Sequence, residues 1–145
     1  MTTIAYKDGM LAADTACCQG GVLCGSIVKI VRRDDGDMAG AAGDASYNHA
    51  FNAWFLAGEN GAPPEAKEGE RSFDRGVVYR RSGAIDVFEP RGRFTMNAPF
   101  YAFGSGKELA LGAMFAGADA ETAIKAAIHF DPHTGGEITV LRHDD

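Results

Sequence analysis

The chain has 145 residues, the length of one ordinary domain, and its 46% apolar and 23% charged residues are typical of a soluble globular protein. The net charge is −6 and no basic cluster is longer than two residues, which argues against nucleic acid, because its binding depends on neutralising several phosphates. No stretch approaches the roughly 20 apolar residues that cross a bilayer, so we expect neither a nucleic-acid nor a membrane partner.

Two features of the sequence indicate a reducing compartment. The start lacks the basic region and long apolar segment of a secretory signal. The three cysteines, Cys17, Cys18 and Cys24, cannot all pair with one another, and two of them are adjacent. We therefore expect a cytoplasmic protein. Neither an internal repeat nor a linker divides the sequence, so a single domain over residues 1–145 is predicted.

Two β-hairpins are predicted in the first third of the chain. Apolar runs at residues 3–6 and 10–13 flank Lys7-Asp8-Gly9, and Asp-Gly between apolar runs is the best short-range signal for a hairpin. A second hairpin is indicated by a strand at residues 27–31, a polar turn at 34–37 and a small-residue strand at 38–42.

A helix follows the second hairpin. Asp44 is a candidate N-cap whose carboxylate can accept free backbone N–H groups, and Tyr47, Phe51 and Phe55 recur at helical spacing up to a stop at Gly58. Residues 59–72 are rich in Gly, Pro, Glu and Lys without periodicity, which predicts an exposed loop.

The second half of the chain predicts three strands, two helices and a last strand. Ser105 and Glu108 can form a capping box that starts a helix through Met114, and Asp119 can cap a second helix over residues 120–130. The strands are expected at residues 76–80, 84–88, 100–103 and 138–141. This order favours an α+β layered sandwich over a doubly wound sheet.

The first candidate for chemistry is Met1-Thr2. Methionine followed by a small residue is the usual substrate for initiator-methionine removal, which would leave Thr2 with a free α-amine. Such an amine titrates near about pH 8, so it can take the hydroxyl proton without a histidine. Met-Thr openings are common, however, and by themselves they favour an ordinary chain start.

Asp14 and Lys29 form a second candidate pair. If the strand around Lys29 buries one face, the ammonium can point inward beside the chain start, where its charge would lower the pKa of a nucleophile while Asp14 holds it in place. An ordinary solvated lysine on the polar face of a strand is the equally open alternative.

Residues 40–44, Gly-Ala-Ala-Gly-Asp, carry a strand into a helix through small residues. Backbone N–H groups left free near a helix N-terminus can hold an oxyanion. Taken alone, the pattern favours a tight strand-to-helix turn instead.

Two other motifs are set aside. Gly104-Ser105-Gly106-Lys107 is not a phosphate loop, because that motif needs glycine where Tyr101 stands and a hydroxyl where Glu108 stands. His129, Asp131 and His133 alternate like metal ligands, but Pro132 and the turn after it favour a compact loop. We expect no metal and no cofactor.

Taken together, these features resemble the proteasome β-subunit family and its bacterial two-component, HslV-like relative, which are N-terminal nucleophile (Ntn) hydrolases. The match lies in motifs of the same order and approximate spacing: Thr2-Thr3-Ile4-Ala5, Asp14, Lys29-Ile30, Ala42-Gly43-Asp44, Gly104-Ser105-Gly106, and Asp-Pro-His-Thr-Gly-Gly at 131–136, similar to the family's Asp-x-x-Ser-Gly-Gly.

By this resemblance, Thr2 is the nucleophile with its amine as base, Asp14 and Lys29 tune it, and the Gly43 N–H stabilises the oxyanion. Ser105, Asp131 and Thr134 would form a hydrogen-bonded group around the amine, with Thr134 where serine is more usual. The implied fold is a four-layer αββα sandwich of two antiparallel sheets flanked by helices. Residues 59–72 replace what is normally a second helix.

The leading hypothesis is a threonine-type peptidase acting on a peptide or protein through an acyl-enzyme, in a homo-oligomer such as a ring, with an unfolding ATPase as a candidate partner. A retained Met1 would block the base and silence the site. The alternatives are an amidase for a small substrate and a catalytically inactive assembly or binding module, such as a small viral, phage-type member.

Overall fold

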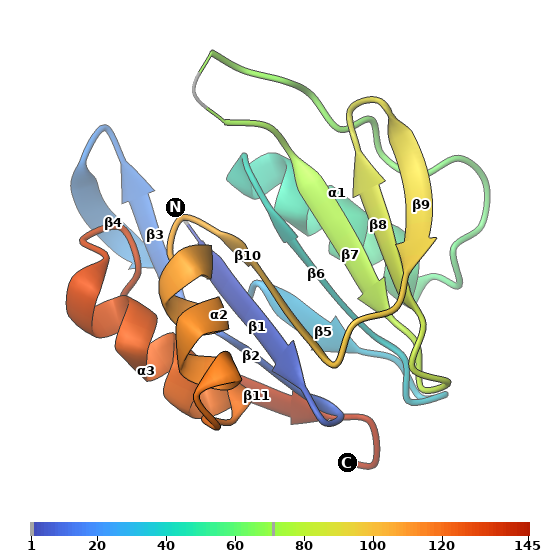
Figure 1. Ribbon diagram of the computed structural model, residues 1–145. Coiled ribbons are helices and arrows are strands. Elements are labelled where there is room, and N and C mark those ends of the chain that lie inside the picture. The colour runs from blue at the N-terminus through green and yellow to red at the C-terminus, as the bar shows by residue number, and fades with distance from the viewer. Residues whose placement is uncertain (1, 71) are drawn as a thin grey trace.

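The computed structural model describes residues 2–70 and 72–145 (Figure 1). Two antiparallel sheets and a separate hairpin form the framework. The four-stranded sheet has the order β10 (Phe100–Gly104), β1 (Thr3–Lys7), β2 (Met10–Ala13), β11 (Thr139–Arg142). The five-stranded sheet has the order β5 (Ile30–Arg32), β6 (Met38–Ala42), β7 (Arg75–Tyr79), β8 (Ile85–Glu89), β9 (Gly92–Met96). The hairpin pairs β3 (Ala16–Gln19) with β4 (Val22–Ser26).

Three helices complete the described part of the chain: α1 (Ala45–Leu56), α2 (Lys107–Phe115) and α3 (Ala120–Phe130). The predicted α+β class with antiparallel sheets is therefore confirmed. Within the described residues, no helix combines the length and apolar character needed to cross a bilayer.

The core lies in three clusters that follow the two-residue alternation of the strands. On β1, Ile4 and Tyr6 join a cluster between the two sheets, together with Val77 and Tyr79 of β7. Ala5, on the opposite face, packs with apolar residues of α2 and α3. A third cluster lies between α1 and the outer face of the five-stranded sheet. The sheets therefore face each other, with α2 and α3 on one outside and α1 on the other (Figure 1).

The first predicted hairpin is confirmed, with Asp8 (φ 51°) and Gly9 (φ 78°) in the left-handed conformation that such a turn needs. The second is confirmed with a shorter first strand, because β5 begins at Ile30. Lys29 is not part of the β5–β6 pairing, and its backbone carbonyl accepts hydrogen bonds from the side-chain amides of Asn48 and Asn52.

Of three predicted helix caps, Asp119 is confirmed, Asp44 is confirmed in position but not in its hydrogen bond, and the capping box of α2 is wrong. Asp44 occupies the N-cap position of α1, but its exposed carboxylate accepts no capping hydrogen bond within the described residues. The predicted capping box of α2 does not form, because the Ser105 hydroxyl donates to Asp131 instead and the helix starts after Gly106. Asp119 caps α3 as predicted, by accepting the Thr122 N–H at 2.8 Å.

The remaining predicted elements are confirmed within a residue or two of their bounds. The structure adds β3, β4 and β9, which the sequence analysis did not predict. The predicted loop at residues 59–72 has one isolated bridge among the described residues, from Glu68 to Phe73 just after the loop; Arg71 lies outside the described residues.

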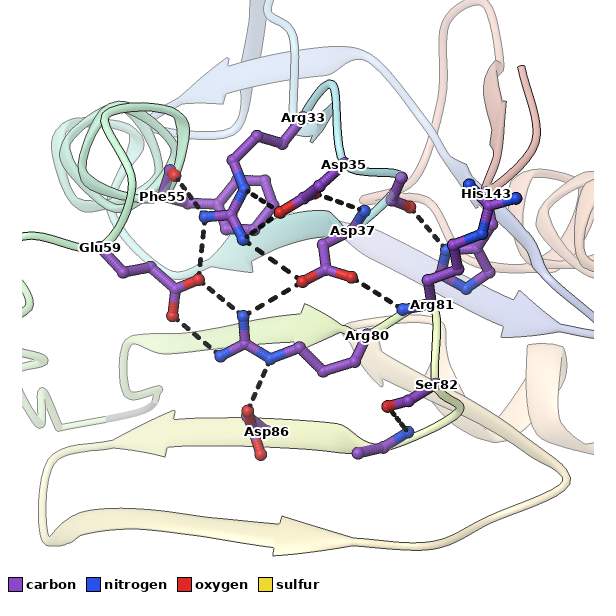
Figure 2. Close-up of polar contacts among 12 residues, drawn as sticks. Arg33, Asp35, Asp37, Phe55, Glu59, Arg80, Arg81, Ser82, Asp86 and His143 are labelled. Carbon is purple, nitrogen blue, oxygen red and sulfur yellow. Dashed lines mark hydrogen bonds and ion pairs between the residues drawn. The ribbon is translucent and has the colours of Figure 1, made fainter.

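A network of ion pairs joins Glu59, just after the end of α1, to Arg33 after β5 and Arg80 after β7, as Figure 2 shows. Glu59 accepts hydrogen bonds from Arg33 at 3.0 Å and from both terminal nitrogens of Arg80 at 2.6 and 2.8 Å. Arg80 also contacts Asp37 and Asp86. The Arg33 guanidinium lies 4.4 Å from the centre of the Phe55 ring. These contacts hold α1 against the five-stranded sheet, and with it the turn that precedes the helix.

Candidate active site

The start of the chain is tied to the end of β10. The Thr2 carbonyl accepts a hydrogen bond from the Ser105 N–H at 2.7 Å, and the Ser105 hydroxyl lies 3.5 Å from the same oxygen. Gly104 has a φ of 103°, and a Cβ at this position would overlap the Thr2 carbonyl. Glycine at position 104 therefore allows Thr2 to lie directly against β10.

Thr2 lines a small pocket of about 60 Å³ together with Lys29, Gly43 and Asn48. The alternation of β1 places Thr2 in line with Ile4 and Tyr6, which face the second sheet. The hairpin β3–β4 supplies Ala16, Cys17 and Cys18 to the same pocket. The structure thus brings the predicted nucleophile, lysine and oxyanion glycine to one place.

Asp14 is a fully buried carboxylate that accepts three hydrogen bonds. Its Oδ1 accepts from the Thr3 N–H and from Lys29 Nζ, each at 3.0 Å, and its Oδ2 accepts from the Gly135 N–H, also at 3.0 Å. Lys29 is 1% exposed. A buried ammonium is tolerated here because a buried carboxylate is paired with it. The solvated-lysine alternative is therefore wrong.

Two asparagines of α1 fix the backbone of Lys29. Asn48 donates to the carbonyls of Lys29 at 3.1 Å and Ala41 at 2.7 Å, and Asn52 donates to the Lys29 carbonyl at 3.2 Å. Both side chains are buried. The helix, the start of β5 and the end of β6 are thereby joined beside the pocket.

Gly43 ends the pairing between β6 and β7. The ladder runs to Ala42 opposite Arg75, and Gly43 then turns away with a φ of 119°. A Cβ on Gly43 would overlap the Asp74 carboxylate, which accepts the Asp44 N–H at 3.0 Å. The glycine is required both by its backbone conformation and by this close approach.

Ser105, Asp131 and Thr134 form the predicted hydrogen-bonded group. The hydroxyls of Ser105 and Thr134 each donate to Asp131 Oδ2 at 2.6 Å, and the His133 N–H donates to Oδ1 at 3.1 Å. Thr3 Oγ1 accepts the Gly106 N–H at 2.9 Å and lies 2.7 Å from Thr134 Oγ1. Because the Thr134 proton is directed to Asp131, Thr3 is the donor to Thr134.

The charge of Asp131 is stabilised by this group. Burial raises the pKa of the Asp131 carboxyl, but hydrogen bonds from Ser105, Thr134 and the His133 N–H outweigh burial and leave the pKa below its usual range. Asp131 is therefore an anion at neutral pH, and it orders the Ser105 hydroxyl next to Thr2.

The alternation of His129, Asp131 and His133 does not assemble a metal site. The Asp131 oxygens are occupied by hydroxyl and amide donors. Among residues 2–70 and 72–145, no group of three potential ligands is placed to hold a metal ion.

Three residues that shape the site were not predicted from the sequence: Thr3, Asn48 and Asp74. A polar threonine on the helix-facing side of β1, beside Ala5, was a usable signal for Thr3.

Met1 lies outside the described residues, so its removal stays a prediction. A larger hollow of about 160 Å³ between Glu68 and Arg91 shares no lining residue with the Thr2 pocket.

No protein-family model matches the sequence, and comparison with curated proteins finds no match. Among solved structures, the chain is similar to Thiobacillus denitrificans BPH in complex with epoxomicin, with a TM-score of 0.68 and 24% identity over 97% of this chain and 96% of that chain. A second structure of T. denitrificans BPH gives a TM-score of 0.65 at 24% identity, over 97% and 95% of the two chains. The chain therefore has a fold similar to that of T. denitrificans BPH.

Proposed function

We propose that this protein is an Ntn hydrolase of proteasome type, a four-layer αββα sandwich in which Thr2, exposed by removal of Met1, attacks an amide or peptide bond. The observation that carries the proposal is the pocket where Thr2, Lys29 and Gly43 meet. These three residues come from three separate segments of the chain, and the proposal gives each a role in nucleophilic attack.

The proposed reaction proceeds through an acyl-enzyme. Thr2 Oγ1 attacks the carbonyl carbon and its proton passes to the free α-amine of Thr2, so one residue supplies nucleophile and base. The Gly43 N–H stabilises the negative oxygen of the tetrahedral intermediate. The intermediate then expels the amine product, which takes the proton, and water hydrolyses the ester on Thr2.

The surroundings of Thr2 support this chemistry. The Lys29 ammonium favours loss of the Thr2 hydroxyl proton, and Asp14 keeps that charge in place at 3.0 Å. Ser105, ordered by Asp131, lies against the Thr2 backbone. BPH, the similar structure, was solved in complex with epoxomicin, a peptide epoxyketone, which makes this compound a suitable probe for the present chain.

The pocket volume keeps a small-substrate amidase as the second candidate. About 60 Å³ is far less than the roughly 300 Å³ or more of a typical ligand pocket, so it holds one small group rather than a long substrate. A peptide would have to extend beyond it.

A homo-oligomer and an unfolding ATPase partner rest on the resemblance, and a cytoplasmic location rests on the composition of the sequence; all three stay predictions. Large apolar side chains at the surface, Phe115 (85% exposed) and Phe130 (68% exposed), are compatible with contact between copies of this chain.

Hydrolysis of a fluorogenic peptide library tests the proposal on protein expressed without an N-terminal tag. We expect turnover by the wild-type protein and by Thr2→Ser, and none by Thr2→Ala. Thr122→Ala, on the exposed side of α3, is the matched control and should behave as wild type. Wild-type turnover by Thr2→Ala would refute the mechanism, and a protein that cleaves only short amides would establish the amidase.

A further inference from the structure

The turn that carries Gly43 is held by the side chain of a residue distant in the sequence. Asp74, 5% exposed, precedes β7 and accepts the Asp44 N–H at Oδ1, at 3.0 Å. Its carboxylate lies where a side chain of Gly43 would be. Backbone pairing of β6 with β7 ends at Ala42, one residue before Gly43. Beyond Ala42, the Asp74 carboxylate takes the place of backbone pairing, because it accepts the Asp44 N–H.

The same carboxylate also binds the loop before β7. Asp74 Oδ2 accepts the Lys67 N–H at 3.0 Å, and the Asp74 N–H donates to the Lys67 carbonyl at 2.9 Å. The segment between them is closed by the Glu68–Phe73 bridge. One buried anion therefore fixes both the loop and the Gly43-Asp44 turn.

The geometry points to Asp74 as a positioning residue for the oxyanion donor: it fixes the Gly43-Asp44 turn and couples that turn to the backbone of Lys67. This inference rests on the proposed function, in which the Gly43 N–H stabilises the oxyanion. Asp74 does not line the Thr2 pocket, so it acts through Gly43 and not on the substrate.

A carboxylate is required because both of its oxygens accept backbone N–H groups. In Asp74→Asn, one oxygen becomes an NH₂ donor, so only one of the two backbone donors keeps an acceptor. Asp74→Ala removes both acceptors and leaves two N–H groups without them. The two variants therefore form a graded series, while Asp34→Asn, on the exposed turn before β6, is a matched control.

Epoxomicin inactivation measures the effect on chemistry separately from binding. Intact-mass analysis of adduct formation gives the maximal rate constant, kinact, and the concentration for half-maximal rate, KI. Since losing one oxyanion donor costs about 100-fold or more in rate, a displaced donor should lower kinact by about tenfold or more in Asp74→Ala. Asp74→Asn should fall between, with KI changed less than about threefold and Asp34→Asn equal to wild type.

A role in stability alone would lower the melting temperature and the reactive fraction without changing kinact of the folded molecules. Wild-type kinact in both Asp74 variants would therefore overturn the inference.

Amide hydrogen exchange, resolved by NMR, tests the placement without any activity. In Asp74→Ala, we expect the amides of both Asp44 and Lys67 to exchange about tenfold or more faster than in wild type. In Asp74→Asn, only one of these two amides should exchange faster, while Val77 stays protected in β7 in both variants. If the wild-type protein forms no epoxomicin adduct, the proposed function fails and this exchange alone decides the positioning role. Unchanged exchange at Asp44 in Asp74→Ala would overturn it.

Discussion

At the residue scale, the site is built around two carboxylates whose donors differ in kind. Asp14 is held by an ammonium and two backbone N–H groups, and Asp131 by two hydroxyls and one N–H. The first arrangement carries a fixed positive charge into the pocket. The second orders hydroxyl groups beside the chain start. Each can be tested by a single substitution.

Lys29→Met should abolish turnover and destabilise the fold. Methionine keeps most of the side-chain volume but leaves Asp14 as a buried anion without its cation, and breaking a buried pair costs about 3–5 kcal/mol. Urea denaturation measures the loss in free energy of unfolding, and peptide hydrolysis measures the activity. Lys125→Met, exposed on α3, is the control. Equal stability and turnover in the two variants would contradict the assigned role of Lys29.

Asp131→Asn should lose stability in a pH-dependent way. Because the pKa of Asp131 is lower in the folded protein than in the unfolded chain, its contribution is present above the unfolded pKa, about 4, and is lost as the pH falls through the folded pKa. The difference in free energy of unfolding between wild type and variant should thus be full at pH 7 and shrink below pH 4. A difference constant from pH 3 to 7 would contradict this.

The proposed site residues Thr2, Asp14, Lys29 and Gly43 could be proposed from the sequence because they lie in short motifs near its start. Asp74 could not, since its partners Asp44 and Lys67 are 30 and 7 residues away and no pattern joins them. Such long-range contacts follow from strand pairing, which a single sequence does not show.

At the scale of elements, the tight passage of the chain start past β10 predicts contrasting effects of two glycine substitutions. Gly104→Ala should lower the free energy of unfolding by at least about 1 kcal/mol, because alanine is strained at a φ of 103° and its Cβ overlaps the Thr2 carbonyl. The displaced Thr2 should also lose its reactivity.

Gly112→Ala is the matched substitution. Gly112 lies in α2 with no neighbouring atom within 4 Å of an added Cβ, so alanine should stabilise the helix by about 1 kcal/mol. Thermal denaturation compares the two variants. Equal effects of the same sign would show that the close contact at Gly104 does not exist.

Elements specified by local signals were predictable. The Asp8-Gly9 turn and the Asp119 cap depend on residues adjacent in the sequence. The hairpin β3–β4 was missed because its sequence does not alternate apolar and polar residues. Val22 and Leu23 are adjacent apolar residues, and both are exposed, at 62% and 66%. The capping box at Ser105 was wrong because a tertiary partner, Asp131, takes the hydroxyl.

At the scale of the whole molecule, α1 and the five-stranded sheet depend on the ion network around Glu59 (Figure 2). Glu59→Gln removes the carboxylate shared by Arg33 and Arg80. Because these side chains are partly exposed, we expect a loss of only about 1 kcal/mol in free energy of unfolding, smaller at high salt. Glu70→Gln, exposed in the loop, is the control. A loss that is independent of salt would contradict an electrostatic origin.

The proposed mechanism depends on Thr2 becoming a free, reactive N-terminus. The most direct measurement is the intact mass of untagged protein before and after treatment with epoxomicin, followed by fragmentation to locate any adduct. We expect loss of Met1 and one adduct at Thr2 that is absent in Thr2→Ala. Retained Met1 with no adduct, or an adduct at another residue, would contradict it.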